Sequence, residues 1–245
     1  MGGNITREGD SALNQGIRAT DSEFVLLLNS DTEALTGTLD IPVRALQSRS
    51  EVGMTTPVLV DGGGDIIQMS WAWTPLFLGE VAQRFFSPRS IQTTPWRRRL
   101  VERLQGRERV VPSICGAAMF VRREALERAG GVDEGFVLYF EDSDLCLRLR
   151  RLGWDLLLVP RARIVHHLAR STAARPGRMA LLYCQSQIRF YRKHGSRTDR
   201  ALLSLYLRLK HWRIYLLRRK GMPPDERDFH RALRGVLKGT ERVGL

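Results

Sequence analysis

The chain has 245 residues, of which 43% are apolar, and it carries a net charge of +13. This length suffices for one medium domain with its own core. No run approaches the ~20 apolar residues that span a bilayer, and the first twenty residues lack the apolar stretch of a signal peptide. We therefore expect a cytoplasmic protein.

The positive charge calls for an anionic partner, which could be nucleic acid, an anionic membrane surface or a phosphorylated substrate. Basic residues cluster at 96–99, 148–151 and 189–220, whereas most acidic residues lie before position 145. The three cysteines are widely spaced and odd in number, which fits neither a disulfide framework nor a zinc site. We expect buried, idle thiols at Cys115, Cys146 and Cys184.

The first part of the chain alternates between helical and extended patterns. Residues 23–28 form a short apolar run bounded by polar turn formers, which is typical of a strand buried on both faces of a parallel sheet. Asp10 or Ser11 is the predicted N-cap of the first helix. The predicted elements are a helix over 10–20, strands over 23–28, 52–60 and 66–70, a helix over 38–48 and a glycine-rich turn at 61–65.

Residues 71–110 are rich in tryptophan, proline and arginine, and we interpret them as a long substrate-facing excursion with one short helix. Regular patterns return at Cys115. The later predicted elements are strands over 117–121, 154–159 (stopped by Pro160) and 164–167, and helices over 123–129, from Asp142 or Ser143 to Leu152, and over about 177–194 and 199–219. Alternating strands and helices predict an α/β fold with a mainly parallel sheet flanked by helices.

Asp31 follows the apolar run of residues 23–28, at the strand end where ligands bind in open α/β sheets. A carboxylate there suits Mg²⁺ or Mn²⁺ bridging two phosphates, because the ion would neutralise charge on a diphosphate leaving group. Asn29, Ser30, Asp31 and Thr32 are also good turn formers, so a solvated turn is the alternative.

A second acidic segment, Glu141-Asp142-Ser143-Asp144, follows an apolar stretch. Acids in a first helical turn are favoured by the helix dipole, which accounts well for Asp144. Adjacent carboxylates repel each other, so a shared task would explain Glu141 and Asp142, one as general base and the other as its support.

Two further pairs have alternative interpretations. His166-His167 could ligate the metal or be structural. Arg122-Arg123, beside the 117–121 strand, could contact phosphate or simply begin a helix.

Taken together and in this order, these motifs resemble the family 2 glycosyltransferases, especially their bacterial rhamnosyltransferase-like branch. Asn14-Gln15-Gly16-Ile17 resembles the family's Asn-x-Gly-Ile helix start, and Asn29-Ser30-Asp31 its metal-binding signature in the Asn-x-Asp form. The resemblance covers about residues 7–195. The segments that carry it are Ala12–Ile17, Phe24–Thr32, Gly116–Arg123, Gly131–Phe136, Tyr139–Leu145, His166–Ser171 and Arg189–Gly195.

The resemblance implies a GT-A-like fold over residues 1–175 and a basic helical extension over 176–245, packed on or beside it. It implies inverting transfer, with Asp142 as the base that deprotonates the acceptor hydroxyl and Glu141 in support. Asp31 would bind Mg²⁺ or Mn²⁺ on the donor diphosphate, with His166 as a further candidate ligand. Candidate contacts to donor or acceptor are Asn14, Asn29, Arg122, Arg123 and Asp144.

The sequence departs from the family pattern at its start. The family has roughly fifty residues before the position of Arg7, which supply the first strands and grip the base, so we expect an N-terminally truncated domain. Arg7 stands where Asn is usual, and Ala169 where Gly is common.

Two functions remain open from sequence. The first is a transferase that moves a sugar from a UDP-, GDP- or dTDP-sugar to a glycan or polyprenyl-linked acceptor in cell-surface polysaccharide synthesis, its basic helices at 178–220 facing an anionic membrane at the inner face of the plasma membrane. The second is a catalytically impaired fragment or basic binding module. Nucleic acid is the weaker partner, because no aromatic-basic reader motif is present.

Overall fold

The computed structural model describes residues 12–72, 76–136, 139–167 and 176–218, together with residues 233 and 235. The chain divides into two compact units. The first comprises residues 1–135 and 141–170, and the second residues 136–140 and 171–245. The expected domain division after residue 175 stays a prediction.

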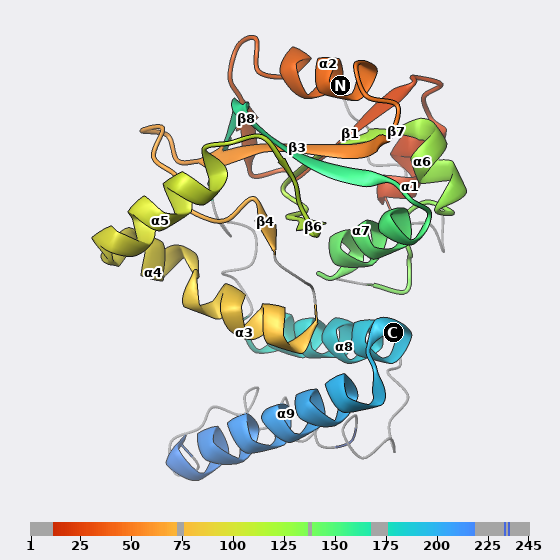
Figure 1. Cartoon of the computed structure of the whole chain (residues 1–245). Helices are drawn as coiled ribbons and strands as arrows, with labels where there is room; N and C mark the ends of the chain where they lie inside the picture. The colour runs from red at the N-terminus through yellow and green to blue at the C-terminus, as the bar shows by residue number, and fades with distance from the viewer. Residues whose placement is uncertain are drawn as a thin grey trace. The chain divides into compact units, whose positions relative to one another are not determined.

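The first unit is built on a sheet whose strand order is β1-β7-β3-β8-β2, with β5 beside β8 (Figure 1). A separate two-stranded sheet pairs β4 with β6. The strands are β1 (Phe24–Leu28), β2 (Thr32–Ala34), β3 (Val52–Val60), β4 (Trp71–Ala72), β5 (Arg109–Val110), β6 (Ser113–Ile114), β7 (Ala118–Arg122) and β8 (Asp155–His166).

Helices cover both faces of this sheet, which confirms the predicted α/β class. Helix α2 (Asp40–Gln47) packs on one face, where Leu46 joins a core formed with β3, β7 and β8. Five of the described helices contribute to the core on the other face, and the alternating side chains of the same strands complete it. They are α1 (Ala12–Arg18), α4 (Pro88–Thr93), α5 (Pro95–Gln105), α6 (Arg123–Arg128) and α7 (Glu141–Arg151).

The predicted direction of the strands is wrong for most of the described sheet. Of its pairings, β3 with β8 is parallel, whereas β1 with β7, β3 with β7, β2 with β8 and β5 with β8 are antiparallel. Val25 and Leu27 of β1 are buried while their neighbours are less so, and β1 lies at the sheet edge. An unbroken apolar run cannot distinguish these arrangements, because its residues are apolar on both faces.

Residues 71–110 contain more helix than the sequence predicts. Where one short helix was expected, the described residues form α3 (Phe77–Phe85), α4 (Pro88–Thr93) and α5. Pro88 and Pro95 each stand at the first helical position, where the missing N–H costs nothing and the fixed φ favours a helix. Two of the prolines that suggested irregular chain are therefore helix starts.

Two further boundaries differ from expectation. Residues 66–70 form an isolated bridge from Ile66 to Val60 instead of a strand. The strand predicted to stop at Pro160 continues to His166, so the two predicted strands are one. Pro160 is accommodated because the pairing of β3 and β8 shifts between Pro57 and Val58, which leaves residues 160–162 of β8 outside the ladder.

Several predictions are confirmed. Helix α6 ends at two glycines with positive φ, Gly130 and Gly131. The cysteines are free; Cys146 and Cys184 are buried as expected, whereas Cys115 is half-buried. Desolvation raises the pKa of Cys115 and of Cys146 to about 12, so both thiols stay protonated near neutral pH. The predicted cap at Asp10 or Ser11, the departures at Arg7 and Ala169, and the tail after Gly221 apart from residues 233 and 235 lie outside the described residues.

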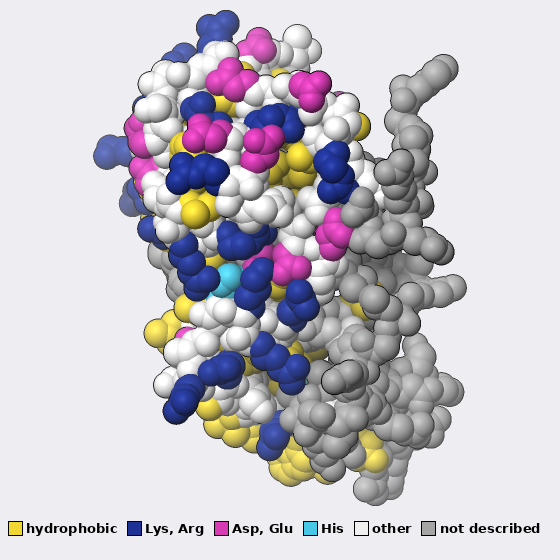
Figure 2. All heavy atoms as spheres, turned by 90° about the vertical axis from the view of Figure 1, so that its right-hand side faces the viewer, with side chains coloured by type: hydrophobic (Ala, Val, Ile, Leu, Met, Phe, Trp, Pro, Cys, Tyr) yellow, Lys and Arg dark blue, Asp and Glu magenta, His cyan; other side chains and the backbone are white. Residues whose placement is uncertain are grey.

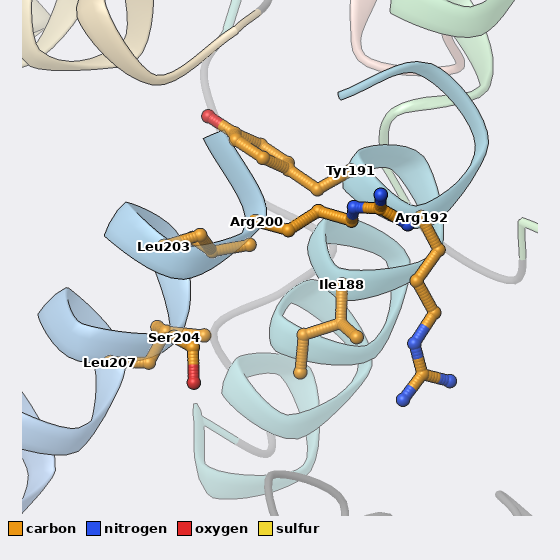
Figure 3. Close-up of a pocket in the computed structure, with 7 residues that line it drawn as sticks. All are labelled: Ile188, Tyr191, Arg192, Arg200, Leu203, Ser204 and Leu207. Carbon is orange, nitrogen blue, oxygen red and sulfur yellow. The ribbon is translucent and has the colours of Figure 1, made fainter. Parts of the chain in front are cut away.

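The second unit contains the two predicted long helices, α8 (Pro176–His194) and α9 (Arg197–Arg218). The rings of Tyr139 and Phe140 pack against Tyr183 of α8, and Phe140 also contacts Phe190. A pocket of about 130 Å³ lies between α8 and α9 (Figure 3). No helix within the described residues is both long enough and apolar enough to cross a bilayer.

Candidate active site

The Asn29–Thr32 segment forms a tight turn at the end of β1. The hydroxyl of Thr32 donates to the carbonyl of Asn29 over 2.6 Å, and the Thr32 N–H donates to the same oxygen over 3.2 Å. The N–H of Asn29 donates to the carbonyl of Ala117 over 3.0 Å, which continues the β1–β7 pairing by one residue. The turn that the sequence offers as the alternative to a metal site is therefore present, and it fixes the position of Asp31.

Asp31 lies against His166. Strand β2 pairs with the end of β8, so that Thr32 stands opposite His166, and Asp31 Oδ1 lies 3.3 Å from His166 Nε2. Both side chains are mostly buried, at 15% and 10% exposure. Burial lowers the pKa of His166, against the opposing attraction of Asp31, so the imidazole is neutral near pH 7.

His167 faces away from this pair. Its side chain lies 3.6 Å from Glu33 Oε2, and its contact with Asp31 is a main-chain hydrogen bond of 2.9 Å to the Asp31 carbonyl. Of the two histidines, His166 is the one whose side chain meets the carboxylate of Asp31.

The residues present fit a divalent cation that a diphosphate helps to bind. A carboxylate oxygen and a neutral imidazole nitrogen lie close enough to bind one ion. No cluster of three or more His, Cys, Asp or Glu side chains is found among the described residues, so a cation here would take its other ligands from phosphate or water. His166 Nδ1 is buried and has no hydrogen-bond partner among those residues.

Asp142 is held by the main chain. Its Oδ2 accepts a hydrogen bond from the N–H of Gly116 over 2.8 Å, and its Oδ1 accepts from the N–H of Ser143 over 2.6 Å. Burial raises the pKa of Asp142, while these two N–H groups act against the rise by stabilising the ionised form. The carboxylate is therefore fixed in orientation.

Gly116 was not singled out from sequence, although a glycine directly before an apolar strand can mark a close approach. A Cβ at this position would lie 3.0 Å from both Cβ and Oδ2 of Asp142. Any larger residue at position 116 would therefore have to displace the side chain of Asp142.

Glu141 begins α7, one residue before the predicted cap. Burial, and then the negative charge of Asp142, raise the pKa of Glu141 to about 7. Its Oε2 is buried without a hydrogen-bond partner among the described residues. Burial therefore raises the pKa of both Glu141 and Asp142, so each carboxyl group keeps a proton to higher pH than an exposed one would.

Both acidic segments are hydrogen-bonded to the two residues that precede β7, where β1 ends. Asn29 is hydrogen-bonded to Ala117, and the adjacent Gly116 is hydrogen-bonded to Asp142. Asp31 follows Asn29 by two residues. Asp31 and Asp142 are more than a hundred positions apart in sequence. They are connected through hydrogen bonds to two consecutive main-chain groups, at residues 116 and 117.

Four other predicted site residues have structural contacts. The amide of Asn14 bonds the main chain of Val132 in both directions and reaches Glu134 Oε1 over 2.7 Å. Asp144 is fully buried and pairs with Arg148 over 2.7 Å. Asn14 thus joins α1 to the loop after α6, while Asp144 holds the guanidinium of Arg148, which donates to the carbonyls of Ala129 and Gly131.

The two arginines beside β7 bind carbonyl groups. Arg122 donates to the carbonyls of three residues around the end of α2, and Arg123 to three around the end of α1. Their side chains are 12% and 18% exposed. With these donors engaged, phosphate binding by Arg122 or Arg123 has no support in the geometry.

The residues just before Glu141 have unusual main-chain conformations. Tyr139 and Phe140 have φ of 65° and 69°, a left-handed region that bulky side chains rarely adopt. Two such residues in a row cost free energy, which the surrounding packing must offset. Main-chain strain of this kind clusters at functional sites.

A sequence model of the family described as "Glycosyltransferase like family 2" matches residues 4–183. This match spans most of the chain, which therefore belongs to that family, as the motifs indicated. The prediction of a family 2 glycosyltransferase-like α/β domain is confirmed.

Among similar proteins, N-acetylglucosaminyl-diphospho-decaprenol L-rhamnosyltransferase of Mycobacterium tuberculosis is 32% identical over 174 residues, which cover 70% of this chain and 55% of the relative. Rhamnosyltransferase WbbL of Escherichia coli K12 is 41% identical over 58 residues, or 24% of this chain and 22% of that protein. The chain thus spans about half the length of the Mycobacterium relative. These names support the rhamnosyltransferase-like branch.

A solved structure with similar features is mannosyltransferase PcManGT from Pyrobaculum calidifontis, in complex with GDP-Man and Mn²⁺. It has a TM-score of 0.46 and 16% identity, and the match covers 97% of this chain and 56% of that one. The assignment depends on the family match, since similarity at this level adds nothing to it.

Proposed function

We propose that this protein transfers a sugar from a nucleotide-diphosphate donor to a hydroxyl of a glycan or lipid-linked acceptor, with inversion at the anomeric carbon. The observation that carries the proposal is the junction at Gly116 and Ala117, which holds Asp142 on one side and the Asn29–Asp31 turn on the other. A donor-binding group and a base must meet at one place in such a reaction.

Asp142 is the proposed general base. The acceptor hydroxyl gives its proton to the Asp142 carboxylate as its oxygen attacks the anomeric carbon, and the bond to the diphosphate breaks. The two N–H groups on Asp142 favour its ionised form before the transfer and hold it in one orientation. Glu141, whose pKa is about 7, supports the site as a hydrogen-bond donor while it keeps its proton.

Asp31 and His166 are the proposed protein ligands of Mg²⁺ or Mn²⁺. When bound, the cation would neutralise the negative charge that develops on the departing diphosphate. The exposed Asn29, at the start of the same turn, is a proposed contact to the donor.

The proposed acceptor is a polyprenyl-linked sugar, since the Mycobacterium relative is named for a diphospho-decaprenol substrate. The proposed donor is a UDP-, GDP- or dTDP-activated sugar, with a deoxyhexose favoured by the names of the relatives. We place the reaction in cell-surface polysaccharide synthesis, at the cytoplasmic face of the plasma membrane, where the protein would associate peripherally.

The test compares Asp142→Asn with the unaltered full chain in a transfer assay with Mn²⁺ and a panel of nucleotide sugars. We expect a loss of roughly 10²–10⁴-fold in the rate of transfer, because the general base is removed. Binding of the donor, measured by calorimetry, should be retained. Glu124→Gln, which changes an exposed acid on α6, is the matched control and should be fully active.

Full activity of Asp142→Asn would overturn the assignment of the base. No binding of any nucleotide sugar by the unaltered chain, together with steeply salt-dependent binding of nucleic acid, would overturn the transferase and favour a basic binding module.

A further inference from the structure

Among the residues that the structure describes, helix α9 has a continuous apolar surface that is left exposed. Leu202, Leu205, Leu209, Trp212 and Leu216 recur at every third or fourth position, so they lie on one face of the helix. Their exposed fractions are 39%, 53%, 55%, 61% and 52%. We call these five residues the α9 stripe. Over a helix, a stripe of this length extends roughly 20 Å.

The opposite face of α9 is the one that packs on α8. Leu203 and Leu207 are 3% and 1% exposed, and they point toward Ile188 of α8 (Figure 3). These residues also line the 130 Å³ pocket between the two helices. The α9 stripe is therefore not needed to hold the helix pair together, and its exposure needs another explanation.

The charge around the α9 stripe indicates what could cover it. Residues 176–218 contain ten Lys and Arg residues and one acidic residue, Asp199. Arg208 and Arg213 are exposed and border the stripe on its two sides. In Figure 2 the surface formed by α8 and α9 carries dark blue basic side chains, with yellow hydrophobic side chains along its lower rim.

We propose that the α9 stripe docks onto a lipid bilayer that contains anionic head groups. This inference rests on the proposed membrane location and names the surface responsible. An apolar stripe of leucine and tryptophan bordered by arginine is the pattern of a helix that lies in the membrane interface. The apolar side chains enter the acyl boundary while the cations meet the anionic head groups, and each cation near such a surface strengthens the attachment.

A second copy of this chain fits the surface less well. Pairing two α9 stripes would bring together two helices that each carry six Lys or Arg residues and one acidic residue, Asp199. Like charges at close approach oppose association, whereas an anionic bilayer offers opposite charge over the whole length of the helix.

The test measures sedimentation of the full chain with vesicles of phosphatidylcholine alone or mixed with phosphatidylglycerol. We expect binding to the mixed vesicles that weakens as salt is raised. Leu205→Gln with Leu209→Gln should weaken it by roughly tenfold or more, because two leucines no longer leave water. Arg208→Gln with Arg213→Gln should weaken binding to the mixed vesicles and leave binding to phosphatidylcholine vesicles unchanged.

The matched control is Leu78→Gln with Val81→Gln on α3, which removes two other exposed apolar side chains, at 77% and 52% exposure. It should bind vesicles as the unaltered chain does. Circular dichroism checks that the substituted proteins are folded, which is expected because all the changed side chains are exposed.

Equal vesicle binding by the α9 and α3 variants would overturn the proposal. So would a concentration-dependent dimer that the α9 substitutions abolish, since that would make the stripe an interface between copies. Hydrolysis of the nucleotide sugar in solution separates this inference from the proposed function: the α9 variants should retain it, and its absence in every protein would count against the transferase instead.

Discussion

The first 170 residues contain 21 basic and 21 acidic residues, whereas residues 171–245 contain 18 basic and five acidic ones. The whole excess charge of the protein therefore lies in the second unit. In the first unit acids are drawn into the structure, as Asp31, Glu141 and Asp142 show, while in the second unit exposed leucines and a tryptophan share one face of α9 between cations. Buried acids suit chemistry on a bound substrate, and exposed apolar residues among cations suit attachment to a surface.

This difference predicts that the two activities can be separated by substitution. Changes at the acidic residues should alter transfer and leave vesicle binding intact, whereas changes on the α9 stripe should do the reverse. Three further experiments on the first unit sharpen the comparison, because each should leave vesicle binding unchanged.

The largest effect is expected for Gly116→Ala. The added methyl group would lie 3.0 Å from Asp142 and would push the carboxylate from its position. A displacement of this kind costs about 10²-fold in turnover, together with about 1–3 kcal/mol of stability from overpacking. Turnover measured in the transfer assay checks it. Gly62→Ala is the matched control, because a Cβ there meets nothing within 4 Å, and equal turnover of the two variants would contradict the role of Gly116.

A smaller effect is expected for Asp31→Asn. The substitution keeps the shape of the side chain but removes its charge, so affinity for a nucleoside diphosphate in the presence of Mn²⁺ should fall by about 10–100-fold. Calorimetry with and without Mn²⁺ measures this. Glu33→Gln alters the neighbouring acid beside His167 and should bind as before. An unchanged Mn²⁺ dependence in Asp31→Asn would remove Asp31 from the proposed metal site.

The smallest effect is expected on stability, through Glu141. Its pKa in the folded protein, about 7, lies above its ordinary value of 4.5, so the folded state keeps a proton that the unfolded chain has lost. The stabilisation from this proton is complete below pH 4.5 and is lost as the pH rises through 7. Glu141→Gln should therefore be more stable than the unaltered protein above pH 8, by about 1–3 kcal/mol, and nearly equal to it near pH 4.

Urea unfolding at the two pH values measures this difference. Glu124→Gln, at an exposed acid, should show no such pH dependence. The same stability difference at both pH values would mean that Glu141 is not held protonated by burial.

Much of the fold could be predicted from sequence, because the apolar patterns of α2, β3, β7, α6, α8 and α9 match their observed positions within a few residues. The direction of the strands could not, since β1 is apolar along its whole length and its pairing with β7 depends on distant chain. The helices that begin at Pro88 and Pro95 were missed because proline both ends and begins helices, and the sequence alone favoured the first interpretation.

The candidate site was predictable as two acidic segments but not as one place. Asp31 and His166 are 135 positions apart, and the pairing of β2 with the end of β8 is what joins them. Asn14, Arg122 and Arg123 make contacts that the sequence could not reveal. Asn14 donates to the Val132 carbonyl and to Glu134, and the two arginines donate to main-chain carbonyls. Only the folded structure shows which hydrogen-bonding groups are already in use.

The break in the pairing of β8 limits the insertions and deletions that this protein can accept. Three residues, 160–162, stand between the part of β8 that pairs with the start of β3 and the part that ends at His166. Because neighbouring side chains in a strand point to opposite faces, deleting one of these three would exchange the places of His166 and His167. Length changes of a single residue at this position should therefore be selected against, while replacements that keep the count should be tolerated.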